Sequence, residues 1–343
     1  MQTQLLQWYA KNKRDLPWRA TANPYHILVS EVMAQQTQIN TLLPYYLRFI
    51  EAFPTIEALA HAPIDQILKI CAGMGYYNRF HNLKKAAEII MKDFGGHIPQ
   101  EPQTLQKLPG IGAYVAGAIS SMAYNKKVPA IDGNVLRVMA RLERNESDIS
   151  KAATKKALAM HVEKIMPDCA GTFNQALMEL GALICKPKNP LCDQCPVFDF
   201  CKGQDIRHRL PVKPSKKPVA EIDKTILLLH HPLHGILMRK RNEKLLHGLW
   251  EFYHVDKALE EKDVKAHFHK LGYTCTQLIY LGEASHRFTH LKWNMVGYIC
   301  QVEESFTIAD YVFVQAEEIN NLAVPSALRK IYTFISLWLH LLP

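Results

Sequence analysis

The chain has 343 residues, of which 48% are hydrophobic and 21% charged, a balance that excludes an intrinsically disordered protein and leaves room for two globular domains. Its formal net charge of +9 favours a polyanionic partner, although basic surfaces without such a partner are also common. The N-terminus has no apolar signal-peptide core, and the apolar run at 331–342 is too short to span a bilayer. We therefore predict a cytoplasmic protein without a membrane partner.

Residues 24–185 are predicted to be almost entirely helical. Apolar residues recur at positions i, i+3 and i+4 in 83–94, 115–124 and 135–142, and Gly95 and Gly96 end the first of these helices. We therefore expect an all-α N-terminal domain over residues 1–203.

Residues 108–114 read Leu-Pro-Gly-Ile-Gly-Ala-Tyr, between a short helix ending near Lys107 and an apolar helix beginning near Gly112. Gly110 and Gly112 let the backbone approach a phosphate closely, while free N–H groups at a helix start point toward the anion. This is a helix-hairpin-helix signature, which predicts a grip on DNA phosphates that does not depend on base sequence. An ordinary turn between two helices is the alternative.

Two carboxyl side chains of the helical region are candidates for acid–base chemistry. Asp132 lies where a helix N-cap would lie, and Glu31 lies among apolar neighbours on a predicted helix. Apolar surroundings would raise the pKa of Glu31, while a more polar helix start would leave Asp132 ionised. The alternatives are a simple cap for Asp132 and a solvated helix face for Glu31.

Four cysteines close the helical stretch, at Cys185, Cys192, Cys195 and Cys201. The C-x6-C-x2-C-x5-C spacing favours a cubane [4Fe-4S] cluster in the loop 185–201, because zinc sites usually have two tight C-x2-C pairs and only one is present. A structural zinc site is the alternative. The other four cysteines are interpreted as unconnected, buried residues: Cys71, Cys169, Cys275 and Cys300.

The composition changes after the cysteines. Residues 204–220 are basic, proline-rich and without periodicity, which is typical of a linker. Beyond it we predict an α+β domain over residues 221–343. Its expected strands are 225–230, 236–239, 249–255, 277–281 and 294–302, and its expected helices are 260–271 and 326–340.

Together these motifs resemble those of adenine DNA glycosylases of the MutY type, within the helix-hairpin-helix superfamily that also contains endonuclease III. The matching segments are 13–19, 30–38, 73–79, 108–114, 131–135 and the four cysteines, and they span nearly all of residues 1–205. The resemblance implies a monomeric enzyme that binds double-stranded DNA, flips out an adenine paired with 8-oxoguanine or guanine, and hydrolyses its N-glycosidic bond. In a bacterium it would be associated with the nucleoid.

The resemblance also implies catalytic roles. Glu31 would protonate adenine N7 as a general acid, and Asp132, held in place by Asn134, would stabilise the cationic sugar. Whether Asp132 also bonds covalently to the sugar stays open. Tyr114 stands where the endonuclease III branch has a lysine that forms a Schiff base and cuts the strand, so a monofunctional enzyme that uses water is implied.

Residues that touch the DNA bases follow from the same resemblance. Gln36 and Tyr76 would enter the base stack, with Thr37 beside the oxidised guanine, although Tyr76 could equally be a core residue. The adenine pocket would be lined by Arg14, Leu16, Trp18, Arg19 and Gln175.

Residues 245–252 and 286–293 resemble the Nudix-like domain of the same family. Phe288, Thr289 and His290 correspond to a Phe-Ser-His loop that reads 8-oxoguanine, with Thr289 keeping the hydroxyl of the serine and adding a methyl group. The sequence contains no Nudix box of clustered glutamates, so we expect recognition without hydrolysis. An endonuclease III-like enzyme, a thymine-mismatch glycosylase and a non-catalytic DNA-binding module are the competing interpretations.

Overall fold

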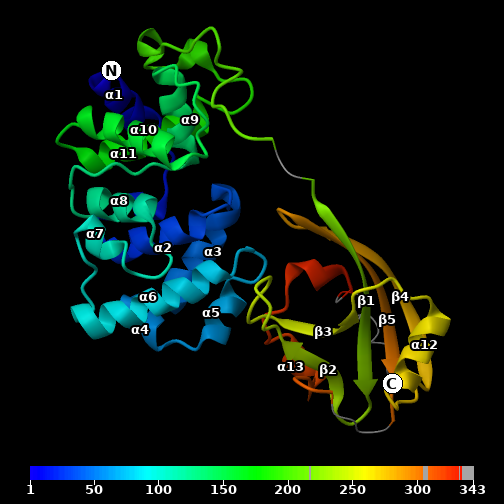
Figure 1. The fold of residues 1–343 in the computed structure, drawn as a ribbon. Coiled ribbons are helices and arrows are strands. Elements are labelled where there is room, and N and C mark those ends of the chain that lie inside the picture. The colour runs from blue at the N-terminus through cyan, green and yellow to red at the C-terminus, as the bar shows by residue number, and fades with distance from the viewer. Residues whose placement is uncertain (216–217, 304–307, 332, 334–343) are drawn as a thin grey trace. The chain divides into compact units, whose positions relative to one another are not determined.

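The computed structural model describes residues 1–215, 218–303, 308–331 and 333. The chain divides into two compact units (Figure 1): residues 1–62 with 79–215, and residues 63–78 with the chain from 216 onward. The first unit is helical, and the second is built around a sheet. Within the described residues, no helix is long and apolar enough to cross a membrane.

Short helices joined by brief connections make up the first unit. They are α1 Gln2–Asn12, η1 Pro17–Arg19, α2 Pro24–Ala34, α3 Ile39–Ala52, α4 Ile56–His61, α6 Asn78–Phe94, α7 Pro102–Leu105, α8 Ala113–Met122, α9 Gly133–Leu142, α10 Ala152–Lys164, α11 Ala170–Leu183, η2 Cys192–Gln194 and η3 Phe198–Phe200. The predicted helices at 83–94, 115–124 and 135–142 are thus present as α6, α8 and α9.

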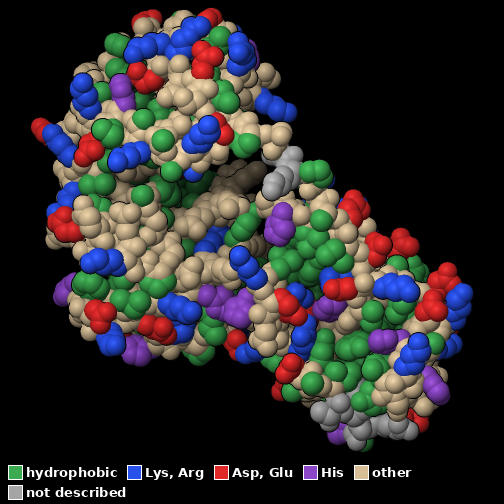
Figure 2. Space-filling view, viewed as in Figure 1, with side chains coloured by type: hydrophobic (Ala, Val, Ile, Leu, Met, Phe, Trp, Pro, Cys, Tyr) green, Lys and Arg blue, Asp and Glu red, His purple; other side chains and the backbone are tan. Residues whose placement is uncertain are grey.

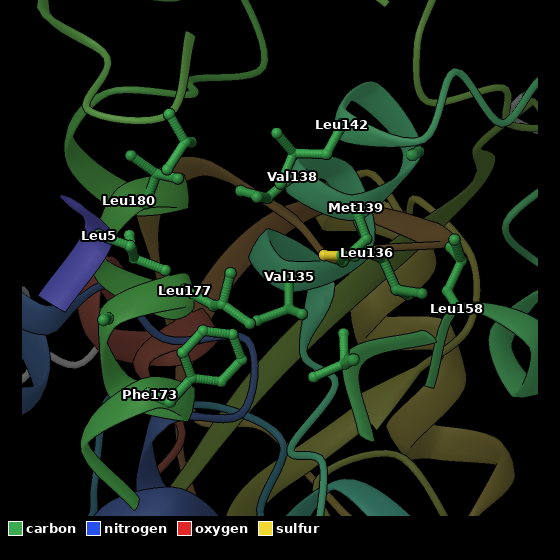
Figure 3. Close-up of a cluster of buried hydrophobic side chains, with 14 of the residues drawn as sticks. Leu5, Val135, Leu136, Val138, Met139, Leu142, Leu158, Phe173, Leu177 and Leu180 are labelled. Atoms are coloured by element: carbon green, nitrogen blue, oxygen red, sulfur yellow. The ribbon is translucent and has the colours of Figure 1, made fainter. Parts of the chain in front are cut away.

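A hydrophobic core joins α1, α9 and α11, as Figure 3 shows. Its fully buried members include Leu5 of α1, Val135 and Met139 of α9, and Phe173 and Leu177 of α11. The α9 residues recur at helical spacing, which is why the apolar pattern predicts this helix. The core fixes the start of α9, and with it the cap residue Asp132, against α11.

Helix α2 is buried on nearly every side. Its residues from Ile27 to Met33 are all buried, and Asn23 caps its start by accepting a hydrogen bond from the Tyr25 N–H. A helix that is apolar all round belongs in a protein interior, and Glu31 is carried there with it. The alternative of a solvated helix face for Glu31 is therefore wrong, because its side chain is 7% exposed.

The second unit contains a six-stranded sheet in the order β4-β5-β1-β3-β2-β6, in which β1 and β5 are parallel and the other neighbours antiparallel. The strands are β1 Ala220–His231, β2 Gly235–Lys240, β3 Trp250–Val255, β4 Gln277–Arg287, β5 Leu291–Gln301 and β6 Val312–Val314. The other elements are α5 Ile64–Ile70, α12 Glu261–Lys270, α13 Ala316–Ile319 and η4 Ser326–Leu328. Helix α12 packs on one apolar face, and a second core that includes Trp293 covers the other.

All five predicted strands and the helix at 260–271 are present, but the short elements β6 and α13 were not predicted. Strand β4 runs on to Arg287 because a bulge between Tyr280 and Gly282 restores its pairing with β5. The helix predicted at 326–340 begins as η4, and most of its range lies outside the described residues.

The interpretation of Cys275 and Cys300 as unconnected residues is wrong. Cys275 lies just before β4, and the pairing of β4 with β5 brings it beside Cys300, with 5.7 Å between the Cα atoms. The two form a disulfide, which a separation of 25 residues does not reveal in the sequence. Cys71 is buried as predicted, whereas Cys169 is exposed.

The first part of the predicted linker makes specific contacts with the first unit. Leu210 is buried, its carbonyl oxygen accepts from Arg141 Nε at 3.1 Å, and the Val212 carbonyl oxygen accepts from the Ile149 N–H at 3.1 Å. The domain boundaries at 1–203, 204–220 and 221–343 stay predictions.

Gly117 on α8 lies against the segment that leads to Asp132. A Cβ at this position would lie 2.2 Å from the Pro129 carbonyl oxygen. We expect Gly117→Ala to lower the free energy of unfolding by about 1–3 kcal/mol, the usual cost of overpacking, as measured by denaturant unfolding. Gly112→Ala is the matched control, since a Cβ there meets nothing within 4 Å. Equal losses in the two variants would contradict the close-approach explanation.

Candidate active site

A cavity of about 1260 Å³ opens in the first unit, with α2, α8, α9 and α11 contributing to its walls. Eleven of the predicted site residues line it: Arg14, Leu16, Trp18, Arg19, Glu31, Gln36, Thr37, Tyr114, Asp132, Asn134 and Gln175. The predicted residues that do not line it are Tyr76, Gly110, Gly112, Phe288, Thr289, His290 and the four cysteines of the loop 185–201. The tertiary structure therefore brings together residues of both ends of the helical domain.

Glu31 is set into the cavity wall by the buried helix α2. Burial raises the pKa of Glu31 to about 7, and the nearby Asp132 carboxylate adds to this rise, while a hydrogen bond from Tyr114 opposes it. The Tyr114 hydroxyl donates to Glu31 Oε2. A carboxyl group with this pKa keeps its proton for about half of the time at neutral pH, so it can act as an acid.

Asp132 is the N-cap of α9, as predicted, and it faces the same cavity. Its Oδ1 accepts from the Val135 N–H at 2.7 Å, and its Oδ2 accepts from Asn134 Nδ2 at 2.7 Å. Burial raises the pKa of Asp132, and these hydrogen bonds, with the Arg137 guanidinium, oppose the rise. The expectation of a polar setting is thus only half right, because the cap bonds are present but the carboxyl is also buried.

The hairpin between α7 and α8 has the geometry that its glycines predict. Gly110 has a φ of 75°, and a Cβ there would lie 2.7 Å from Asn82 Cβ, so a larger residue does not fit. Gly112 is the N-cap of α8, and the space around its missing Cβ is open. Burial and the neighbouring carboxyl groups raise the pKa of Tyr114 well above its usual value, so its hydroxyl stays protonated.

Glu179 is a site residue that the sequence analysis missed. It is buried and contributes to the cavity lining, and its carboxylate accepts from Arg14 Nη2 and Arg19 Nη2, both at 2.7 Å. Burial alone would raise the pKa of Glu179, but the hydrogen bonds from the two arginines outweigh it and lower the pKa to about 2. The carboxylate therefore fixes both guanidinium groups at the cavity. No local motif signals this contact, because 165 positions separate Arg14 from Glu179.

The turn after α2 is held in an unusual backbone conformation. Gln36 has a φ of 57°, which is uncommon for a residue other than glycine. The buried Arg79 side chain supports this turn by donating to the Met33 carbonyl oxygen at 2.7 Å and to Thr37 Oγ1 at 3.0 Å. Gln36 and Thr37 are thereby presented together at the edge of the cavity.

The remaining predicted base-contacting residues belong to the second unit. Tyr76 has a φ of 51° and is 47% exposed, which contradicts the alternative of a core residue. Phe288 lies in the turn between β4 and β5, where its ring meets Trp293 edge-on with 4.9 Å between centroids. Thr289 and His290 follow it and are exposed.

The four cysteines of the loop 185–201 surround one small cavity below α9 and α11. Burial, and then the neighbouring thiols, raise the pKa of Cys195 to about 11, so a metal would be needed to make this sulfur a thiolate at neutral pH. Four thiols around one cavity are the donor set that a [4Fe-4S] cluster requires. The site therefore fits an iron–sulfur cluster held by Cys185, Cys192, Cys195 and Cys201.

Two arginines of α9 connect this loop to its surroundings. Arg137 donates to the Cys185 carbonyl oxygen at 2.7 Å and to Asn134 Oδ1 at 2.9 Å, so it supports the residue that holds Asp132. Arg141 donates to Cys185 Sγ at 3.2 Å.

Basic side chains do not gather into one patch on the face shown in Figure 2, where they are interspersed with acidic ones. The cavity lining is mixed as well, with four basic residues (Arg14, Arg19, Lys155 and Lys156) and four acidic ones (Glu31, Asp132, Glu163 and Glu179).

Three parts of the chain match known families. Residues 29–164 match HhH-GPD superfamily base excision DNA repair proteins, residues 185–201 match the iron–sulfur binding domain of endonuclease III, and residues 225–333 match the NUDIX domain. The adenine DNA glycosylase of Homo sapiens is 32% identical over 395 residues, covering 96% of this chain and 72% of that protein. That of Buchnera aphidicola subsp. Baizongia pistaciae is 34% identical, covering 84% of this chain and 82% of that protein. The chain belongs to the adenine DNA glycosylase family.

Solved structures agree with this membership. A thermostable thymine-DNA glycosylase is 28% identical with a TM-score of 0.53, covering 60% of this chain and 94% of that one. A non-covalent endonuclease III–DNA complex is 22% identical with a TM-score of 0.51, covering 61% and 95%, and shows the fold alone. The family, the two-part fold, the glycosylase activity and the [4Fe-4S] cofactor predicted from the sequence are thereby confirmed.

The glycosylase should lose activity as Glu31 loses its proton. We expect the single-turnover rate of base release to fall as the pH rises above about 7, because only the protonated form below the pKa donates. Glu31→Gln should lower the rate at least about 100-fold at every pH and leave DNA binding intact. Glu163→Gln removes another carboxyl of the same cavity and should keep the wild-type profile. A flat profile from about pH 6 to about pH 8.5 would contradict the role of Glu31.

Removing one thiol should empty the cluster site. We expect Cys195→Ser to lose most of its iron and sulfide and to unfold at a lower temperature, because the cluster is part of the folded loop. Iron and sulfide analysis with thermal unfolding measures both effects. Cys169→Ser, which changes an exposed cysteine outside the loop 185–201, is the control. Full iron content in the Cys195 variant would remove that residue from the ligand set.

Proposed function

We propose that this protein is a monomeric, monofunctional glycosylase that flips out adenine paired with 8-oxoguanine or guanine in double-stranded DNA and hydrolyses its N-glycosidic bond. The observation that carries the proposal is the pair Glu31 and Asp132 in one cavity: the first has a pKa near 7, and the second is stabilised as a carboxylate by cap bonds. The names of the curated relatives support adenine as the base.

In the proposed reaction the proton of Glu31 passes to adenine N7. The electron pair of the bond between N9 and C1′ then leaves with the base, and the Asp132 carboxylate stabilises the positive charge that develops on the sugar. Water adds to C1′ and releases a proton to solvent, which leaves an abasic site. Asn134 keeps Asp132 in position through its side-chain amide.

Tyr114 supports the monofunctional assignment. A phenol cannot form an imine with the sugar, so the strand is not cut through a Schiff base. Its hydroxyl is instead engaged with Glu31. Strand cleavage would need a separate enzyme.

DNA handling in this proposal uses both units. Gly110 and Gly112 lead a backbone grip on phosphates, and Gln36 and Tyr76 fill the base stack while the adenine is out of it. Gln36 and Tyr76 both have a positive φ and an exposed side chain, which suits residues that project from the protein. The recognition of 8-oxoguanine is assigned to Thr37 and to the loop Phe288, Thr289 and His290. We place the enzyme in the cytoplasm, at the nucleoid if it is bacterial.

A single-turnover assay on duplexes with adenine opposite 8-oxoguanine, guanine or thymine tests the proposal. We expect adenine release to be fastest opposite 8-oxoguanine, with strand breaks only after alkali, and no borohydride-trapped adduct. The Glu31→Gln variant controls for a contaminating glycosylase. Strand cleavage without alkali would favour an endonuclease III-like enzyme, release of thymine would favour a mismatch glycosylase, and binding without release would favour a non-catalytic module.

A further inference from the structure

Gln175 is a residue of the cavity wall whose orientation is set by a partner outside the cavity. It lies on α11 and lines the cavity, whereas Tyr9 of α1 does not line it and is buried. The Tyr9 hydroxyl donates to Gln175 Oε1 at 2.7 Å. A side-chain amide has one acceptor end and one donor end, so this bond decides which end is left for a ligand.

The reverse orientation of the amide is disfavoured by the proton of the Tyr9 hydroxyl. Burial raises the pKa of Tyr9, so the hydroxyl is protonated at neutral pH. Among the described residues its acceptor is Gln175 Oε1, and a flipped amide would leave this buried proton without one. An unpaired buried donor costs about 1–3 kcal/mol, so the carbonyl oxygen faces Tyr9 and the Nε2 donor is left for the cavity.

Tyr9 itself has little freedom to move. It belongs to the core of α1, α9 and α11, and its ring lies 5.7 Å from the Arg19 guanidinium. Arg19 is held in turn by the buried Glu179 carboxylate. The hydroxyl therefore has a fixed position, and so does the amide that depends on it.

We propose that Tyr9 determines which base the cavity accepts, by holding Gln175 so that Nε2 donates a hydrogen bond to the unprotonated N1 of the flipped base. This inference rests on the proposed function, in which Glu31 uses N7. Adenine keeps a lone pair at N1, whereas hypoxanthine and guanine carry a hydrogen there, so a fixed donor disfavours them. Tyr9 is a positioning residue, because it acts through Gln175.

The variant Tyr9→Phe removes only the hydroxyl and keeps the ring beside Arg19. We expect the single-turnover rate of adenine release opposite 8-oxoguanine to fall about tenfold, because the amide is free to turn. The rate ratio of adenine to hypoxanthine should fall with it, while the pH profile set by Glu31 keeps its shape. Tyr25→Phe is the matched control, since the buried Tyr25 hydroxyl donates to the Phe53 carbonyl oxygen at 2.6 Å and Tyr25 does not line the cavity.

Analogues that lack one ring nitrogen locate the contact. On 1-deazaadenine, which lacks the bonded nitrogen, the wild-type enzyme should already be slow, and Tyr9→Phe should cause no further loss. On 3-deazaadenine, which keeps N1, Tyr9→Phe should cause the same loss as on adenine. An equal loss on adenine and on both analogues would overturn the proposal, because it would indicate a purely structural role. If Tyr9→Phe does not fold, Gln175→Leu carries the same comparison, with the same outcome overturning it.

The outcomes separate this inference from the proposed function. Suppose that the wild-type enzyme releases adenine and that folded Tyr9→Phe has the same adenine-to-hypoxanthine rate ratio as the wild type. That result rejects the inference alone. Failure of the wild-type enzyme to release adenine at all rejects the proposed function and the inference together.

Discussion

A carboxyl group inside apolar protein gives up its hydration, and it avoids most of the cost of that loss by keeping its proton. Helix α2 is apolar all round, so it must be buried, and it takes Glu31 with it. The surroundings of Glu31 accommodate this buried acid. Tyr114 bonds to Glu31 while keeping its own proton, and Asp132 raises the pKa of Glu31 further. An acid that is active near neutral pH thus follows from the burial of a helix.

In the proposed reaction the opposite requirement applies to Asp132, which acts as a carboxylate in the same cavity. The N-cap bond and the Asn134 amide favour the carboxylate form against the effect of burial. Arg137 then connects Asn134 to the backbone of Cys185, so the loop with the four cysteines also supports the carboxylate that we propose to be catalytic. Glu179 plays a similar supporting part elsewhere in the cavity lining, because its ion pairs fix Arg14 and Arg19.

Features with a local signal could be predicted well. The hairpin glycines, the four cysteines and the apolar periodicity of α6, α8 and α9 depend on residues a few positions apart, and local geometry dictates them. Contacts between distant residues could not be predicted in this way. Glu179 looks like any helical glutamate in the sequence, and the Cys275–Cys300 disulfide depends on strand pairing. The setting of Asp132 was only half predicted, because a cap residue can be read locally but its burial cannot.

By itself, the sequence determined the family and the cofactor and singled out two carboxyl groups as candidates, because spacing and residue type carry that chemistry. Only the tertiary structure decided how burial and hydrogen bonds shift the pKa of each carboxyl group, and which way the polar side chains of the cavity are turned. The orientation of the Gln175 amide depends on Tyr9, 166 positions away, and the position of the two pocket arginines depends on an equally distant carboxylate. These assignments arise from burial and from hydrogen bonds across the core, and such contacts exist only once α1 and α11 have packed together.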